Sequence, residues 1–272
     1  MRKYRIGSIA LCLLAGAGGG CQTVSTTAPG AIGVERRQTM LVSEAEVEQS
    51  AVQAYAEELG KAKEKGQLNS DARQLQRVRG IADRLIAQVG VFRADAKSWQ
   101  WSVNVQTSKD INAYCMPGGK IMVYTGLIEK LSLSDAELAA VIGHEIAHAL
   151  REHSREAVSR AYAQQVGLGA LGALAGLSTD AVSLAGAVTN VTFTLPRSRL
   201  QETEADRIGL ELMARAGYDP RAALSLWRKM GQSADSGTPA FMSTHPSDAA
   251  RLSDLEALLP RVEPLYQQAA KN

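Results

Sequence analysis

Three side chains that can support hydrolytic chemistry lie together in the stretch His144-Glu145-Ile146-Ala147-His148. On a helix, residues four apart differ by roughly 40° in direction, so both imidazoles project from one face. At this spacing they can bind one metal ion at about 2.0–2.1 Å, the distance that Zn²⁺ prefers. Glu145 is placed to accept a proton from a water molecule held at the metal. The stretch predicts a catalytic zinc site, although a solvent-exposed pair of histidines also fits the pentapeptide.

The residues around this stretch predict the helix that the chemistry requires. Ser134 and Glu137 have the spacing of a capping box, which marks a helix start. An apolar face follows at helical spacing, formed by Leu138, Val141, Ile142, Ile146 and Ala149. His153, nine residues after His144, would point to the opposite side of a continuous helix, so we expect it at the surface.

A small sheet is predicted directly before this helix. The runs 99–105, 111–115 and 120–124 read as strands, and Pro117-Gly118-Gly119 predicts a hairpin between the last two. Trp99 and Trp101 are interpreted as packing residues. The other elements are expected to be helices at 43–64, 69–90, 200–216, 220–230 and 247–259. The fold class is therefore α+β and mainly helical.

Residues 166–189 are rich in Gly, Ala and Leu. The uninterrupted apolar run ends at Leu177, which is too short to cross a bilayer, and Asp180 follows it. We expect two short, closely packed helices covering the site, with a turn at Ser178-Thr179-Asp180. Such a pair has the position of a lid, although the sequence says nothing of movement.

A third metal ligand is expected from the acidic run Glu202-Thr203-Glu204-Ala205-Asp206. Glu202 and Asp206 share a helix face, so one can bind the metal while the other accepts the remaining N–H of a liganding histidine. Glu204 lies about 200° from Glu202 and is expected to face solvent. The plainer reading is a solvated acidic face.

The ordered set of motifs resembles the M48 family of zinc metallopeptidases, over residues 70–255, and within it the periplasmic lipoprotein members of bacteria. The motifs are the H-E-x-x-H stretch, the E-x-E-A-D run after Ser198-Arg199, Tyr124-Thr125-Gly126-Leu127, and Thr244-His245-Pro246 with Arg251. The resemblance implies a zincin-like domain that packs its small sheet beside the active helix. It also implies one Zn²⁺ per chain, bound by His144, His148 and Glu202.

The resemblance also assigns roles around the metal. Asp206 would support a zinc-bound histidine, and the strand edge at Asn112 and Ala113 would bind an extended substrate. His245 or Arg251 would stabilise the oxyanion of the attacked carbonyl. His245 has two alternatives: it occupies the open zinc position and holds the enzyme inactive, or it has no catalytic role.

The N-terminus predicts export. A basic start and an apolar stretch precede Gly18-Gly19-Gly20-Cys21, which resembles a bacterial lipobox except for glycine at its first position. We expect a signal peptide at 1–20, a lipidated Cys21, a tether at 21–42 and the peptidase domain at 43–272. Ordinary cleavage, leaving a soluble secreted protein, is the alternative. Gln22, in place of the Asp that retains lipoproteins in the inner membrane, implies an outer-membrane lipoprotein facing the periplasm.

Composition narrows the function further. The net charge of +2 over 272 residues gives no reason to expect nucleic acid as a partner. Cysteines number three and form no C-x-x-C pair, so no thiolate zinc site is indicated, and Cys115 is interpreted as buried packing. The family resemblance and the export signal together imply an envelope endopeptidase, and the resemblance alone implies misfolded or misassembled proteins as its substrates. The alternative is an assembly or quality-control factor that binds outer-membrane proteins and cleaves rarely.

Overall fold

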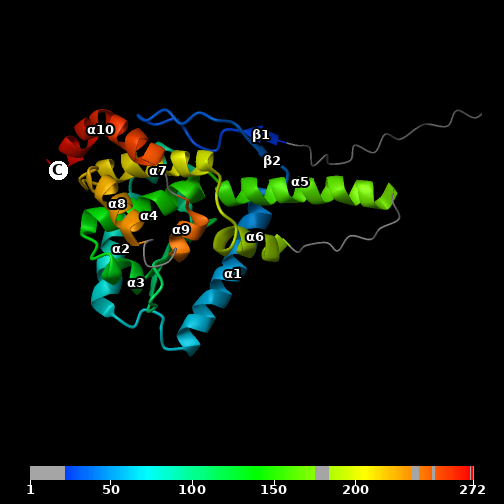
Figure 1. Ribbon diagram of the computed structural model, residues 1–272, viewed down its shortest axis with the longest axis horizontal. Coiled ribbons are helices and arrows are strands. Elements are labelled where there is room, and N and C mark those ends of the chain that lie inside the picture. The colour runs from blue at the N-terminus through cyan, green and yellow to red at the C-terminus, as the bar shows by residue number, and fades with distance from the viewer. Residues whose placement is uncertain (1–21, 175–183, 234–238, 247–248, 270, 272) are drawn as a thin grey trace, which may run out of the picture.

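The computed structural model describes residues 22–174, 184–233, 239–246, 249–269 and 271. The described chain is mainly helical with two small sheets (Figure 1), which confirms the predicted class. The strands are β1 (Gln22–Val24), β2 (Gln38–Met40), β3 (Ser102–Gln106), β4 (Ala113–Met116) and β5 (Lys120–Tyr124). The helices are α1 (Glu44–Glu64), α2 (Ala72–Ile86), α3 (Thr125–Lys130), α4 (Asp135–Leu150), α5 (His153–Leu174), α6 (Leu184–Phe193), α7 (Arg199–Arg215), α8 (Ala222–Ser233), α9 (Ala240–Thr244) and α10 (Ala249–Ala269), with short 3₁₀ turns at Val89–Val91 and Asp95–Ser98.

The three predicted strands of the middle region form one sheet in the order β3-β5-β4. β4 and β5 make the predicted hairpin, whose turn glycines Gly118 and Gly119 both have positive φ. β3 pairs with β5 in parallel, and a Cβ on Gly119 would lie 2.5 Å from the ring of Trp101, which confirms that tryptophan as a packing residue. β4 is an edge strand of this sheet and packs against α4.

Helix α4 carries the H-E-x-x-H stretch and begins at the predicted capping box. The Ser134 hydroxyl accepts from the Glu137 amide, and the Glu137 carboxylate accepts from the Ser134 amide. α4 packs most extensively against α7. The two helices meet closely because glycines face each other: a Cβ on Gly209 would lie 2.8 Å from the backbone N of His144, and one on Gly143 would lie 3.1 Å from the carbonyl O of Gly209. This close crossing brings the α7 side chains to the histidines.

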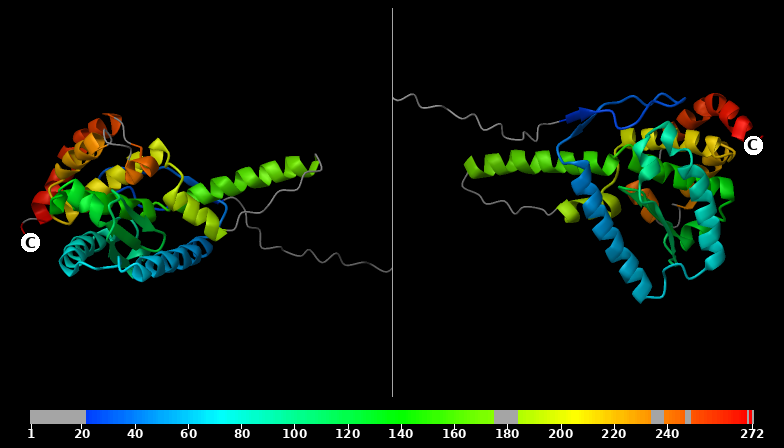
Figure 2. Two further views of the ribbon diagram at one scale, coloured as in Figure 1. Left: turned by 60° about the horizontal axis from the view of Figure 1, so that its bottom comes forward. Right: turned by 180° about the vertical axis from the view of Figure 1, so that it is seen from behind.

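Helices α5 and α6 occupy most of the Gly, Ala and Leu-rich region. α5 is longer than the short helix that we predicted and projects from the body that contains α4 and α7 (Figures 1 and 2). α6 packs against α5 and α1, and Phe193 at its end contacts the Tyr114 ring of β4 with centroids 4.9 Å apart. The predicted turn at 178–180 lies outside the described residues. Among the described helices, none is both long enough and apolar enough to cross a membrane.

The N-terminal strap, residues 22–42, lies within the segment predicted as a tether at 21–42, and it is packed onto the fold. β1 and β2 pair within it, and Ile32, Val34 and Met40 are buried. The amides of Ala31 and Ile32 donate to the Glu211 carboxylate of α7 at 2.7 and 3.1 Å. These contacts extend the folded unit before residue 43, since apolar side chains of the strap join the core.

Candidate metal centre

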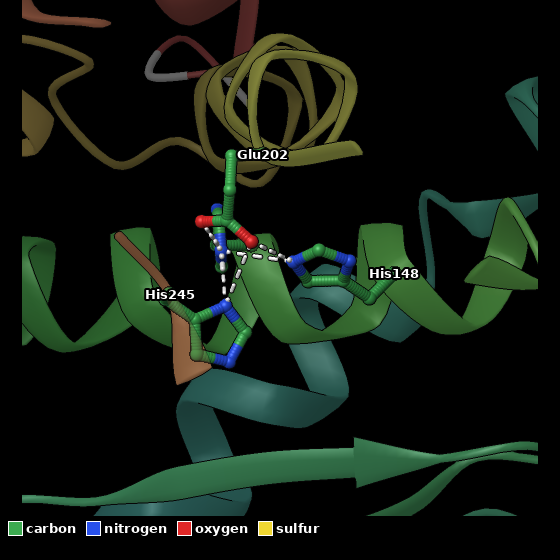
Figure 3. A group of neighbouring side chains, drawn as sticks. His148, Glu202 and His245 are labelled. Atoms are coloured by element: carbon green, nitrogen blue, oxygen red, sulfur yellow. Dashed lines mark hydrogen bonds and ion pairs between the residues drawn. The ribbon is translucent and has the colours of Figure 1, made fainter. Parts of the chain in front are cut away.

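Four side chains from three parts of the chain converge beside α4. The metal-ligating atoms of His144, His148, Glu202 and His245 all lie within 4.8 Å of one another, and all four residues are buried. Figure 3 shows Glu202 reaching down from α7 toward His148 on α4, with the His245 ring facing the same point. The fold thus brings together the three predicted ligands, and beside them it places His245, for which the open zinc position was one of the alternatives.

The separations between these atoms fit a zinc ion. An ion with bonds of about 2.0–2.1 Å to four tetrahedral ligands requires ligand atoms about 3.3 Å apart. The Nε2 atoms of His144 and His148 are 3.1 Å apart, and they lie 3.5 and 3.3 Å from the carboxylate oxygens of Glu202. His245 Nδ1 lies 3.0 Å from Glu202 and 3.3 Å from His144 Nε2. Two imidazole nitrogens facing each other beside a carboxylate are a donor set for a cation.

The far side of the His144 ring is held by Asp206, as predicted. Nδ1 of His144 lies 3.0 Å from Oδ1 of Asp206, so it donates there when Nε2 faces the metal. Arg251 donates to both carboxylate oxygens of Asp206, at 2.6 and 2.7 Å, and its Nη1 lies 2.9 Å from Glu202. Arg251 therefore fixes the two acidic residues. This geometry does not favour the oxyanion role expected for Arg251, because its N–H groups are directed to these carboxylates and to the Pro246 carbonyl.

The far side of the His148 ring is held by two residues that we expected at the surface. Nδ1 of His148 lies 2.7 Å from Nδ1 of His153, whose Nε2 lies 2.9 Å from the Glu204 carboxylate. If Nε2 of His148 faces the metal, its Nδ1–H donates to His153, and Nε2–H of His153 donates to Glu204. His153 and Glu204 are fully or almost fully buried, so both surface predictions are wrong.

This hydrogen-bonded series ends in the N-terminal strap. Arg36 forms ion pairs with Glu204 at 2.8 Å and with Glu156 at 2.5 Å, and Arg151 contacts Glu204 at 3.2 Å. Arg151 is itself buried and donates to the Arg36 carbonyl at 2.9 Å. The strap thus covers the face of α7 opposite Glu202, which explains why Glu204 is buried.

The acidic residues of the centre stabilise positive charge placed between them. Burial disfavours a charged His144, but its hydrogen bonds with Asp206 and Glu202 outweigh burial and raise the pKa of His144 to about 9. Burial alone would raise the pKa of Glu202, yet the charge of His245 and the hydrogen bonds from the histidines hold it well below its usual range. Burial lowers the pKa of His148 well below normal. An ionised Glu202 and a neutral His148 are the protonation states that a metal ligand requires, whereas His144 must release its Nε2 proton when a metal ion binds.

The remaining predicted residues lie on α4, at the edge strand β4 and at the N-terminus. Nε2 of His245 is 3.5 Å from the Glu145 carboxylate, which is buried on α4 next to the ligands. Asn112 precedes the edge strand β4, and Ala113 is the first residue of that strand. Cys115 is a buried free cysteine, and burial raises the pKa of its thiol well above normal, which agrees with packing rather than nucleophilic attack. Cys21 lies outside the described residues.

The family whose model matches this chain is "Peptidase family M48", over residues 72–259. The match covers more than half of the chain, so the chain belongs to peptidase family M48. The resemblance inferred from the motifs is thereby confirmed. Zinc is the metal that this family and the cluster of His144, His148 and Glu202 indicate.

Similar proteins with known names include metalloendopeptidases and a protease. The chain is 39% identical over 151 residues to the mitochondrial metalloendopeptidase OMA1 of Arabidopsis thaliana. The aligned region is 56% of this chain and 30% of the relative. It is 37% identical to the Schizosaccharomyces pombe OMA1 over 185 residues, 67% of this chain and 52% of the relative. It is 30% identical over 176 residues to the beta-barrel assembly-enhancing protease of Escherichia coli, 60% of this chain and 35% of that protein. The chain thus matches between about a third and about half of the length of these relatives.

Proposed function

We propose that this chain is a zinc-dependent endopeptidase of the bacterial cell envelope that hydrolyses misfolded or misassembled envelope proteins. The observation that supports the activity most directly is the buried set of His144, His148 and Glu202 at tetrahedral separations, with Glu145 beside it. A structural zinc site requires the ligands but no carboxylate at the position of Glu145. The names of the relatives, metalloendopeptidases and a protease, agree with this proposal.

Each residue of the centre has a task in the proposed reaction. The zinc ion, when bound, supplies a Lewis acid that polarises the scissile carbonyl and acidifies water. Glu145 accepts the proton of the attacking water and then delivers it to the leaving amine. Asp206 and His153 hold the rings of His144 and His148 in the tautomers that direct Nε2 to the ion. The edge strand β4 binds the substrate backbone as an added strand.

Hydrolysis of unfolded casein tests the activity. The purified chain should cleave casein, a chelator should stop the cleavage, and added Zn²⁺ should restore it. Glu145→Gln should lower kcat by about 10²–10⁴-fold while zinc content stays at one ion per chain. Cleavage by Glu145→Gln at the wild-type rate would contradict the mechanism.

A second candidate is a quality-control or assembly factor with rare or regulated proteolysis. It is favoured by His245 Nδ1, which lies at the fourth corner of the ligand set, where a catalytic site keeps an open position. His245→Ala separates the two: release of a block should raise casein hydrolysis, whereas loss of an oxyanion donor should lower it. The protease relative of Escherichia coli is named for beta-barrel assembly, so outer-membrane proteins are the partners to examine first.

We place the protein at the outer membrane, facing the periplasm and anchored by a lipid on Cys21. The support is the small-residue sequence before Cys21 and Gln22 after it. Labelling with radioactive palmitate tests it: the wild type should take up label and fractionate with outer membranes. Equal labelling of Cys21→Ala would contradict the lipid anchor.

A further inference from the structure

A buried arginine beside the centre has no assigned partner or role. Arg197, in the connection between α6 and α7, is 8% exposed. Its Nε and Nη1 atoms are buried and have no hydrogen-bond partner among the residues that the structure describes. An unpaired guanidinium is costly to bury, since removing it from water without a partner loses several kcal/mol. Such a group implies a ligand whose oxygen atoms take the place of the missing partner.

The location of Arg197 indicates which ligand that is. Its backbone N–H donates to the Thr244 carbonyl at 2.9 Å, next to His245 of the metal centre. Its charge acts on the carboxylates of Glu145 and Glu202 and on the thiol of Cys115. Glu145 belongs to α4 and Cys115 to the edge strand β4. The backbone bond thus places Arg197 beside His245, and its charge acts on the base that activates water and on a residue of the strand along which an extended substrate would pair.

The other cations of the centre are already engaged. Arg251 forms ion pairs with Asp206 and Glu202. His245 lies at ligand distance from Glu202. Arg197 has two buried donors that are not used, and a preorganised donor is worth most where negative charge develops in a water-excluded site.

We propose that Arg197 is a catalytic residue that donates hydrogen bonds to the carbonyl oxygen of the scissile peptide bond and stabilises the negative charge it gains when water attacks. The inference rests on the proposed peptidase function. Water adds its oxygen to the carbonyl carbon, the carbonyl π pair moves onto the oxygen facing Arg197, and Glu145 takes the released proton. When the C–N bond breaks, that pair re-forms the carbonyl and Glu145 protonates the amine.

Steady-state kinetics on a quenched fluorescent peptide with uncharged side chains tests this role. Arg197→Ala should lower kcat by about 10²–10³-fold with KM changed by a few-fold, because the donor acts on charge that exists only in the transition state. Arg197→Lys should recover part of the loss, and added guanidinium should rescue Arg197→Ala. The surface variant Arg221→Ala is the control, and zinc content should equal that of the wild type in all three variants.

Binding of a phosphinic peptide, whose tetrahedral anionic group imitates the attacked carbonyl, gives a readout independent of turnover. Arg197→Ala should bind it at least tenfold more weakly than the wild type, and the corresponding amide should bind equally to both. If the wild type cleaves the peptide and Arg197→Ala cleaves it at the same rate, the role of Arg197 is overturned while the proposed peptidase function stands. A loss confined to peptides with acidic side chains would also overturn it, since Arg197 would then select a side chain. A wild type that cleaves nothing would contradict the proposed function, and unchanged phosphinic-peptide binding by Arg197→Ala would overturn the inference there too.

Discussion

The hydrogen bond between His153 and His148 is expected to determine how tightly the centre holds zinc. The two Nδ1 atoms are 2.7 Å apart, and His153 is fully buried. His153→Ala removes the acceptor for the Nδ1–H of His148, so the ring can rotate and is no longer fixed in the tautomer that directs Nε2 to the ion. The Glu204 carboxylate stays paired, because Arg36 and Arg151 still contact it.

The expected losses of zinc affinity and of stability in His153→Ala follow from these contacts. Removing the partner of a liganding histidine typically weakens metal binding by 10–100-fold, which corresponds to about 1.4–2.8 kcal/mol. Because Glu204 keeps its arginines, the added cost to the zinc-free fold should be about 1–3 kcal/mol, that of one buried side chain and its hydrogen bonds. Competition with a chromophoric chelator measures the zinc dissociation constant, and urea unfolding of the zinc-free protein measures stability.

A matched variant separates orientation of His148 from a general loosening of the fold. His153→Gln keeps a side-chain carbonyl that can accept from His148, so it should bind zinc more tightly than His153→Ala at similar stability. The reasoning is refuted if His153→Ala binds zinc within twofold of the wild type. It is also refuted if the two variants lose zinc affinity equally.

Four further perturbations test other parts of the structure. Burial alone would raise the pKa of Glu137, but hydrogen bonds from Lys229 and the Ser134 backbone lower it to about 2. The contribution of the Glu137 carboxylate to the free energy of unfolding is therefore complete above the unfolded pKa near 4.5 and is lost as pH falls toward 2. In Glu137→Gln, the free energy of unfolding in urea should depend less on pH across that window. Arg36→Ala should lower the free energy of unfolding in urea by about 1–3 kcal/mol, since it deprives two buried carboxylates of their shared cation. Gly209→Ala should lower the free energy of unfolding by about 1–3 kcal/mol and weaken zinc binding, because the added Cβ would press on the α4 backbone. Cys115→Ala should retain casein hydrolysis within about twofold, and the wild-type thiol should react with alkylating reagents only after unfolding.

The ligands could be predicted from sequence because local periodicity determines them. His144 and His148 share a face at any position of a regular helix, as do Glu202 and Asp206. The capping boxes at Ser134 and Ser198 fix where both helices start. Periodicity does not predict that α4 and α7 pack together. That packing depends on the facing glycines Gly143 and Gly209, and the need for a third zinc ligand and the family resemblance only suggested it.

The two wrong surface predictions, for His153 and Glu204, have separate physical causes. His153 was placed by continuing the α4 helix, but α4 ends at Leu150 and Glu152 has a φ of +50°, so the chain turns before His153 begins α5. No residue type in this stretch signals that turn. Glu204 does lie on the side of α7 away from the metal, as its angle requires. Its burial depends on a strap more than 160 residues earlier in the chain, which helical geometry cannot reveal.

Helix α7 organises the centre because its carboxylates position both zinc-binding histidines, two from the face toward the metal and one, through His153, from the opposite face. Glu202 faces the metal and Asp206 holds His144, while Glu204 on the other face holds His148 through His153. The two supports end in different elements. Asp206 is fixed by Arg251 of α10, and Glu204 by Arg36 of the N-terminal strap. The orientation of each zinc-binding histidine is thus tied to a separate part of the chain, so disturbing the strap affects His148 first and leaves the support of His144 in place.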